Sequence, residues 1–190
     1  MLKQFEEEIA KTFDAGQIPY PVHLENGNEA HLARIFQDIR DDDYVFGSWR
    51  MHSKALLKGV PWHDLKRAIM NGHSMALRFD EYRVYGSAIV GGIVPIALGA
   101  AMAIKRRNGS EKVWCFVGDM TSMTGIFSEC HRYADNFNLP IKFVLEDNNL
   151  SVCTNTREVW GGEPPRSPRI EYFQYKSRWP HCGTGKRVQF

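Results

Sequence analysis

The chain has 190 residues, of which 43% are hydrophobic and 24% are charged, and this supplies enough apolar material for one ordinary globular core. Its formal net charge of +2 and its pI of about 8.3 lie too close to neutrality to indicate a nucleic-acid or membrane-surface partner. The cysteines are scattered singly without a C-x-x-C pair, so the sequence encodes neither a zinc site nor a disulfide framework. We expect a single domain over residues 1–190.

Neither a membrane segment nor an export signal is predicted. The longest apolar stretch, residues 89–104, is interrupted by glycines and a proline and is shorter than the roughly 20 residues that span a bilayer. Residues 1–13 carry consecutive glutamates inside a helical pattern, unlike a basic and then apolar secretion signal or an acid-poor transit peptide. The sequence therefore predicts a cytoplasmic protein.

The first half of the chain predicts helices separated by loops. Apolar residues recur at steps of three and four in residues 1–13 and 28–40, which indicates two amphipathic helices joined by a link that contains Gly, Pro and Asn. Residues 44–53 mix aromatic, glycine and basic side chains without a helical period, a composition that favours a loop. Pro61 in a first turn and Gly72 just past the end delimit a third helix.

The second half predicts a strand-helix-strand unit. Small apolar residues from 89 to 104, followed by three basic residues at the negative end of the helix dipole, predict a buried helix. Short apolar runs at 112–117 and 141–145 are typical of buried parallel strands, and residues 124–139 have the length and period of one crossover helix. The predicted fold class is α/β, with a parallel sheet flanked by helices. Residues 155–190, rich in proline, aromatic and basic residues, predict an irregular segment.

Polar side chains follow both predicted strands. Asp119 stands at the carboxyl end of the first strand and Asn148, 29 residues later, at the carboxyl end of the second. Open α/β sheets bind ligands at such ends, and neighbouring strands lie about 5 Å apart, so adjacent strands would bring both side chains to one point. A carboxylate and an amide oxygen suit Mg²⁺, which completes its shell with phosphate oxygens and water. These side chains therefore predict a diphosphate ligand. The start of the helix near Thr124 also favours an anion, because a helix N-terminus carries free N–H groups and partial positive charge.

Five sequence blocks resemble, in order, the alpha subunits of pyruvate and branched-chain 2-oxo acid dehydrogenases, which depend on thiamine diphosphate. Gly118, Asp119 and Asn148 look like the GDG-to-NN motif of thiamine-diphosphate enzymes and have its spacing. The blocks are YVFGSWRMHSKALLKG, GHSM, YGSAIVGGIVPIALGAAMA, WCFVGDM and FNLPIKFVLEDNN. The resemblance covers roughly residues 44–153 and implies the diphosphate-binding half of a thiamine-diphosphate-binding fold.

The resemblance assigns one group of residues to the metal ion and the diphosphate. Asp119, Asn148 and the carbonyl of Leu150 would hold Mg²⁺. Arg50, which has the right chemistry for phosphate, and its neighbour Trp49 would face the diphosphate. The remaining cofactor-binding residues of this group are Gly118, Met120 and Thr121. Met120 departs from the family, which has a glycine there, but it keeps a backbone N–H for the diphosphate.

A second group is assigned to the organic part of the cofactor. The backbone from Ala88 to Val90 would contact the aminopyrimidine ring, with Val90 using its carbonyl. His52 would lie near the reacting carbon as a catalytic residue. The alternative for His52 is a structural histidine with satisfied hydrogen bonds, and the sequence leaves both open.

The resemblance also implies partners. Thiamine diphosphate adds to a small 2-oxo acid and stores the electron pair that remains when CO₂ leaves. The glutamate that activates the cofactor in this family belongs to a beta-type subunit. This implies an α2β2 hetero-oligomer, with a homodimer as the alternative, and a lipoyl carrier protein as the acyl acceptor.

Two alternative functions remain open. The chain stops at Phe190, short of the usual family length, which favours a scaffold subunit that keeps the fold and has lost turnover. Ketol transfer of the transketolase type shares the diphosphate motif, although the WRMH and IVGG blocks favour the oxo-acid group.

Overall fold

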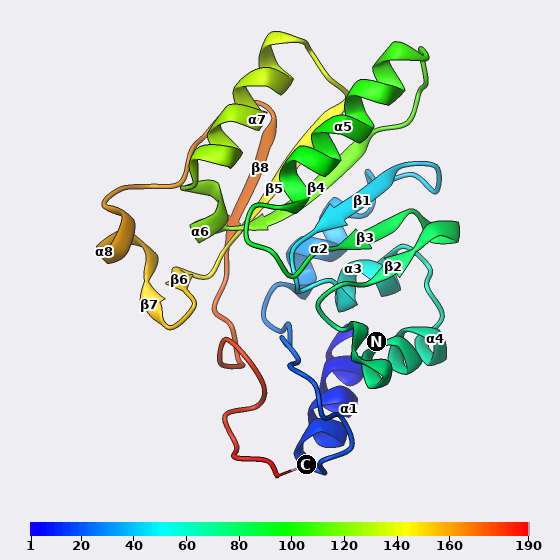
Figure 1. Ribbon diagram of the computed structural model, residues 1–190, viewed down its shortest axis with the longest axis vertical. Helices are drawn as coiled ribbons and strands as arrows, with labels where there is room; N and C mark the ends of the chain where they lie inside the picture. The colour runs from blue at the N-terminus through cyan, green and yellow to red at the C-terminus, as the bar shows by residue number, and fades with distance from the viewer. Residues whose placement is uncertain (190) are drawn as a thin grey trace.

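A computed structural model describes residues 1–189 of the protein as an α/β structure built on one six-stranded sheet (Figure 1). In spatial order, the strands are β2 (Arg78–Phe79), β3 (Val84–Gly86), β1 (Tyr44–Gly47), β4 (Val113–Gly118), β5 (Ile141–Asp147) and β8 (Ile170–Gln174). All neighbours are parallel except β2, which pairs antiparallel with β3. The predicted fold class is confirmed.

Helices cover both faces of the sheet (Figure 1). One face carries α5 (Ile93–Arg106) and α7 (Gly125–Asn136), which lie side by side. The other face carries α1 (Leu2–Asp14), α2 (Glu29–Ile35), α3 (His52–Leu57) and α4 (Trp62–Ala68), which continues into a π-helical turn, η1 (Ile69–His73). The shorter elements are a 3₁₀ turn, η2 (Asp80–Tyr82), the helices α6 (Asp119–Ser122) and α8 (Thr156–Trp160), and a hairpin of β6 (Leu150–Ser151) and β7 (Thr154–Asn155). Within residues 1–189, no helix is long and apolar enough to cross a membrane.

The alternation of side chains along β4 divides the hydrophobic core in two. Cys115 and Val117 pack with α5 and α7 on one face, while Trp114 and Phe116 pack with α1 to α4 on the other. Successive side chains of a strand point to opposite faces, and both faces of this sheet are covered by helices. This explains why the strand is apolar throughout instead of alternating between apolar and polar residues.

The crossover from β4 through α7 to β5 has the predicted form. β4 and β5 are parallel neighbours, in register from Val113 opposite Ile141 to Gly118 opposite Glu146. The Thr124 hydroxyl caps α7 by accepting a hydrogen bond from the Phe127 N–H at 3.4 Å. The two carboxyl ends therefore lie side by side at one edge of the sheet, and the residues that follow each strand are brought together there.

The predicted loop at residues 44–53 is wrong in its first part. Tyr44–Gly47 form β1, the strand between β3 and β4, and Val45 and Phe46 are buried in the two cores. Strands β2 and β3, within residues 78–86, were not predicted either. Both strands are too short for a recognisable alternation, and they are fixed by pairing with distant parts of the chain.

Two other boundaries differ from those predicted. The helix expected at 28–40 ends at Ile35, because residues 36–38 continue as turns. The segment expected to be irregular, 155–190, contains α8 and the strand β8, which extends the sheet beyond β5. Residues 161–169 and 175–189 have no helix or strand.

After β8 the chain forms a tail, residues 175–189, that runs from the carboxyl edge of the sheet to α1 (Figure 1). The Gly183 N–H donates to the Val22 carbonyl at 2.8 Å. At α1, Arg178 pairs with Glu7 at 2.8 Å, and Lys186 pairs with Asp14 at 2.8 Å. The tail thus connects the last strand of the sheet to the first helix of the chain.

Candidate functional site

The carboxyl edge of the sheet holds a narrow cavity of about 50 Å³, here called the edge cavity. Eight of the predicted site residues line it: Trp49, Arg50, Gly118, Asp119, Met120, Thr121, Asn148 and Leu150. The other lining residues are Ser48, Glu146, Val152, Tyr175 and His181. The structure therefore brings together the carboxyl ends of β1, β4 and β5, which are far apart in sequence. Open α/β sheets bind their ligands at such strand ends.

Asp119, directly after β4, is the acidic centre of the edge cavity. Its side chain is buried, with the residue 2% exposed, and its Oδ2 atom has no hydrogen-bond partner among the described residues. Burial raises the pKa of Asp119, hydrogen bonding by Thr156 opposes this shift, and the neighbouring charge of Asp147 adds to it. A buried carboxylate oxygen without a partner is costly, and a bound cation would satisfy it.

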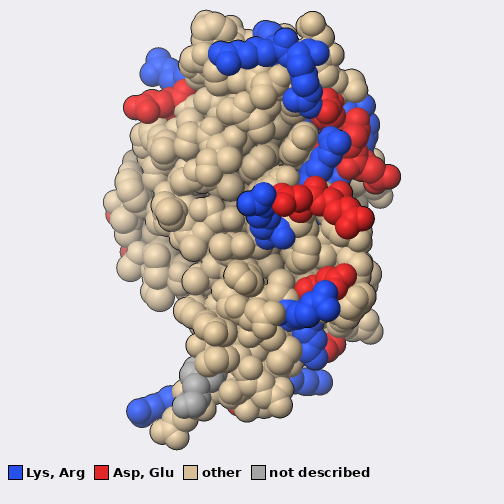
Figure 2. All heavy atoms as spheres, turned by 45° about the vertical axis from the view of Figure 1, so that its right-hand side comes forward, with Lys and Arg blue, Asp and Glu red and all other residues tan. Residues whose placement is uncertain are grey.

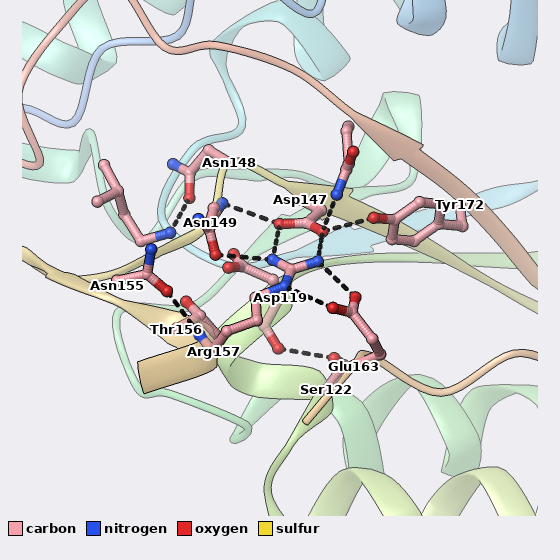
Figure 3. Close-up of polar contacts among 12 residues, drawn as sticks. Asp119, Ser122, Asp147, Asn148, Asn149, Asn155, Thr156, Arg157, Glu163 and Tyr172 are labelled. Atoms are coloured by element: carbon pink, nitrogen blue, oxygen red, sulfur yellow. Dashed lines mark hydrogen bonds and ion pairs between the residues drawn. The ribbon is translucent and has the colours of Figure 1, made fainter. Parts of the chain in front are cut away.

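Asn148 and Leu150 line the cavity from the segment that follows β5. Figure 3 shows Asn148 close to Asp147, the last residue of β5. The Leu150 N–H donates to Asn148 Oδ1 at 3.0 Å, so the two residues form a tight turn beside Asp119. Within residues 1–189, no group of three His, Cys, Asp or Glu side chains could hold a metal ion. A cation here would therefore rely on one carboxylate, one amide oxygen and a backbone carbonyl, a set of hard oxygen ligands that fits Mg²⁺ better than zinc.

Trp49 and Arg50, between β1 and α3, form the opposite wall. The indole Nε1 of Trp49 is buried without a hydrogen-bond partner in the described part of the chain. Arg50 donates through Nη2 to the His181 carbonyl at 2.9 Å and through Nε to the Leu24 carbonyl at 3.4 Å. The guanidinium is therefore already hydrogen-bonded to the tail and to the link before α2.

The tail explains why the edge cavity is narrow. Pockets for small-molecule ligands usually enclose about 300–1,000 Å³. Tyr175 and His181 of the tail line this cavity, and burial raises the pKa of Tyr175 above its usual range. A diphosphate is larger than this cavity, so its binding there would require the tail to move away.

A buried charged cluster lies behind Arg50. Lys54 is fully buried, and its ammonium pairs with Glu25, with Glu146 at 2.8 Å, and with the Arg50 carbonyl at 3.0 Å. The Asn28 amide donates to both carboxylates, at 3.1 and 3.0 Å. Burial disfavours the ammonium, but the two carboxylates outweigh it and raise the pKa of Lys54, while burial raises the pKa of Glu146. One ammonium shared by two carboxylates fixes the backbone that presents Arg50.

His52 is placed away from the cavity. It is fully buried, its Nδ1 lies 3.0 Å from Glu6 Oε1, and its Nε2 lies 2.9 Å from Ser74 Oγ. Both ring nitrogens are thus satisfied by the protein interior, the arrangement of a structural histidine. The geometry favours this alternative over a catalytic role.

Ala88 and Val90 are also outside the edge cavity. They lie in the exposed loop between β3 and α5, and Val90 is 39% exposed. The start of α7, expected near an anion, does not line the cavity in the described chain, because α6 intervenes between β4 and α7. The helix dipole of α7 is therefore not part of this site.

Sequence reasoning missed five lining residues. Ser48 adjoins Trp49, while Glu146 and Val152 lie two residues from Asn148 and Leu150, so their position in the sequence could have indicated them. Tyr175 and His181 carry no local signal, because only the path of the tail brings them to this edge. Their contribution depends on tertiary structure alone.

The fold and this site define an α/β protein with a ligand site at the carboxyl edge of its parallel strands. The sequence model described as the dehydrogenase E1 component matches residues 1–162. The chain therefore belongs to the dehydrogenase E1 component family, and its resemblance to alpha subunits of thiamine-diphosphate-dependent 2-oxo acid dehydrogenases is confirmed.

Individual relatives support the same assignment. The chloroplastic pyruvate dehydrogenase E1 component subunit alpha-3 of Arabidopsis thaliana is 31% identical over 188 residues, covering 85% of this chain and 43% of the relative. The alpha subunit of acetoin:2,6-dichlorophenolindophenol oxidoreductase from Cupriavidus necator is 32% identical over 164 residues, with coverages of 81% and 49%. The pyruvate dehydrogenase E1 component subunit alpha of Rickettsia prowazekii is 28% identical over 165 residues, with coverages of 82% and 51%. The chain spans about half the length of these relatives.

Proposed function

We propose that this chain is an alpha-type subunit of a thiamine-diphosphate-dependent 2-oxo acid dehydrogenase and binds the magnesium diphosphate of the cofactor in the edge cavity. The observation that carries the proposal is the buried Oδ2 atom of Asp119, which has no hydrogen-bond partner within residues 1–189 and lies in the same cavity as Asn148, Leu150 and Arg50. Membership of the E1 family supports oxo-acid chemistry over ketol transfer.

The residues of the chain would bind and orient the cofactor. Asp119, Asn148 and the Leu150 carbonyl would hold Mg²⁺, and the cation would favour the ionised form of Asp119 against its burial. Arg50 and the indole N–H of Trp49 would donate hydrogen bonds to diphosphate oxygens. When bound, thiamine diphosphate supplies the thiazolium carbon that removes CO₂ from a 2-oxo acid.

Two further sets of predicted residues have less direct roles. The exposed loop with Ala88 and Val90 is the part of the chain available to the aminopyrimidine ring. His52 would have an indirect role, because its contacts with Glu6 and Ser74 fix the start of α3, two residues after Arg50.

Exposed apolar side chains beside the site support a beta-type partner. Ile89, Val90, Ile96 and Ile126 are 70%, 39%, 57% and 39% exposed. Ile89 and Val90 belong to the loop that contains Gly91, and Ile96 lies in α5, which follows it. An added Cβ at Gly91 would lie only 2.7 Å from Ile126 Cγ2. Figure 2 shows a broad face largely free of Lys, Arg, Asp and Glu, with charges of both signs gathered along one side. Exposed apolar side chains that lie near one another, such as these four, often mark an interaction site.

The activating glutamate would come from that beta-type subunit, and the assembly would be α2β2, with a homodimer as the alternative. The acyl acceptor would be a lipoyl carrier protein and the substrate a small 2-oxo acid. A cytoplasmic location stays a prediction, since one relative is described as chloroplastic.

The first test is a thermal-shift titration of the full chain with thiamine diphosphate and Mg²⁺. A ligand that binds only the folded state stabilises it by about 2.7 kcal/mol at a concentration 100 times its Kd. We expect a rise in Tm that requires both components, and Asp119→Asn should abolish the Mg²⁺-dependent part, because it removes the one anionic oxygen ligand.

Asp80→Asn is the control, since Asp80 is 60% exposed and lies away from the edge cavity. It should leave the rise in Tm unchanged. Equal shifts for Asp119→Asn and the unmodified chain would exclude Asp119 as a metal ligand. A complete absence of any shift would favour the scaffold alternative. Decarboxylation of pyruvate and branched 2-oxo acids with an artificial electron acceptor, measured with a beta-type chain present, would then separate oxo-acid chemistry from ketol transfer.

A further inference from the structure

Asp147, the last residue of β5, anchors the loop that carries Asn148 and Leu150. Its side chain is fully buried and forms a bidentate pair with the Arg157 guanidinium (Figure 3). Arg157 Nη1 donates to Oδ1 at 2.8 Å, and Nη2 donates to Oδ2 at 2.5 Å. From β8, the Tyr172 hydroxyl donates to Oδ2 at 2.6 Å and the Gln174 amide donates at 3.2 Å. The carboxylate is therefore held on several sides.

The same pair holds the loop itself. Asp147 Oδ1 accepts from the Asn149 N–H at 2.8 Å, and Arg157 Nη1 donates to Asn149 Oδ1 at 2.9 Å. Asn149 has a left-handed backbone with φ of 59°, a strained conformation that such bonds can maintain. The Thr156 N–H donates to the Asn149 carbonyl at 3.2 Å, which closes the loop over residues 149–156.

Neither Asp147 nor Arg157 lines the edge cavity, although Asn148 and Leu150 do. The pair lies on the other side of the loop, with Arg157 also donating to Glu163 at 2.9 Å. A bidentate guanidinium–carboxylate pair fixes direction as well as distance, which a single ammonium cannot do.

We propose that Asp147 and Arg157 are positioning residues of the cation site. They fix the loop so that the amide oxygen of Asn148 and the carbonyl of Leu150 face Asp119, and they do so without contacting the cation. This inference rests on the proposed function, because it assumes that Asp119, Asn148 and Leu150 bind Mg²⁺. Partners that orient metal ligands typically change metal affinity about 10–100-fold when they are removed.

The test measures the Mg²⁺ concentration that gives half of the rise in Tm at saturating thiamine diphosphate. Arg157→Ala should raise it about 10–100-fold. Arg157→Lys keeps the positive charge but loses the bidentate geometry, so it should raise the half-saturating concentration of Mg²⁺ by a smaller factor. It also provides the test if Arg157→Ala does not fold. A merely structural role would lower the Tm of the ligand-free chain and leave the half-saturating concentration of Mg²⁺ unchanged.

Arg169→Ala is the matched control. The Arg169 side chain is 19% exposed, against 20% for Arg157, and it pairs with Asp135 at 2.6 Å and donates to the Leu139 carbonyl at 2.7 Å. It precedes β8, at the opposite edge of the sheet. Arg169→Ala should lower the ligand-free Tm without changing the half-saturating concentration of Mg²⁺.

The outcomes separate this inference from the proposed function. Unchanged half-saturation in both Arg157 variants would overturn the positioning role while the cation site stands. Equal increases in Arg157→Ala and Arg169→Ala would also overturn it, because general loosening of the fold would then be the cause. No response to Mg²⁺ in the unmodified chain would overturn the proposed function, and the positioning role would fall with it.

Discussion

His23 is a buried histidine that faces positive charge. The residue is 7% exposed, and its ring centroid lies 4.8 Å from that of His181 and 5.7 Å from that of Trp49. Burial, followed by the charges of Arg50, His181 and His52, lowers the pKa of His23 to about 3. The imidazole therefore stays neutral in the folded protein at pH values where the unfolded chain already binds a proton.

This difference predicts a pH dependence of stability. The folded pKa of about 3 lies below the ordinary value of 6.5, so the unfolded state gains protons first as the pH falls. As the pH falls below about 6.5, His23 should lower the free energy of unfolding by at most about 1.4 kcal/mol per pH unit. Above about pH 6.5, His23 should not affect the pH dependence of the free energy of unfolding. In His23→Gln, urea denaturation at about pH 5 to 6.5 should show a flatter profile.

His63→Gln is the control, because the His63 side chain is 75% exposed. Its pH profile should match that of the unmodified chain. A His23→Gln variant with the original slope between about pH 5 and 6.5 would show that His23 is not the group responsible.

Among the site residues, those that depend on one crossover could be predicted. Asp119 and Asn148 follow two consecutive strands joined by one crossover helix, an arrangement that favours adjacent strands, and both residues line the edge cavity. His52 lies in a matching motif but points into the interior, because side-chain direction is set by packing against α1. Tyr175 and His181 could not be predicted, since their position depends on the path of the whole tail.

At the scale of the element, length and burial decided which parts of the fold could be predicted. α5, α7, β4 and β5 have periods or bounded apolar runs long enough to be recognised. β1 has only four residues, and its apolar side chains point to both cores. It therefore lacks the alternation of apolar and polar residues that marks a half-buried strand. Its strand conformation comes from hydrogen bonding to β3 and β4.

The helix α3 joins the loop before α2 to the sheet through the buried ammonium of Lys54. Lys54→Met should cost about 3–5 kcal/mol in the free energy of unfolding, because Glu25 and Glu146 would lose their cationic partner in the interior. Urea denaturation measures this loss directly.

Lys66→Met is the comparison for Lys54→Met. Lys66 pairs with Glu8 at 2.5 Å, but the two side chains are 32% and 39% exposed, so its removal should cost about 0–1 kcal/mol. Equal losses for the two variants would mean that the buried cluster contributes no more than a surface ion pair.

At the scale of the whole molecule, the tail closes the structure by packing against the loop before α2. Gly27, with φ of 101°, lies under this contact, and an added Cβ would be 2.3 Å from the Lys176 carbonyl oxygen. Gly27→Ala should therefore lower the Tm and push residues 176–183 away. Trypsin should then cut faster after Lys176 and Arg178.

Gly161→Ala provides the matched control for the backbone strain alone. Gly161 also has a positive φ, 65°, but an added Cβ there would meet no atom within 4 Å. It should cost about 1–2 kcal/mol without faster cleavage of the tail. Equal cleavage rates in the two variants would show that the tail does not depend on the close approach at Gly27.

Under the proposed function, the hydrogen bond from Arg50 to the His181 carbonyl would compete with the binding of an anion. Only molecules whose tail had detached would offer a free guanidinium, so the apparent dissociation constant would be the intrinsic one divided by the fraction of such molecules. Gly27→Ala, which raises the fraction, should bind Mg²⁺ and thiamine diphosphate more tightly although it is less stable. Stability and affinity would then move in opposite directions in this protein.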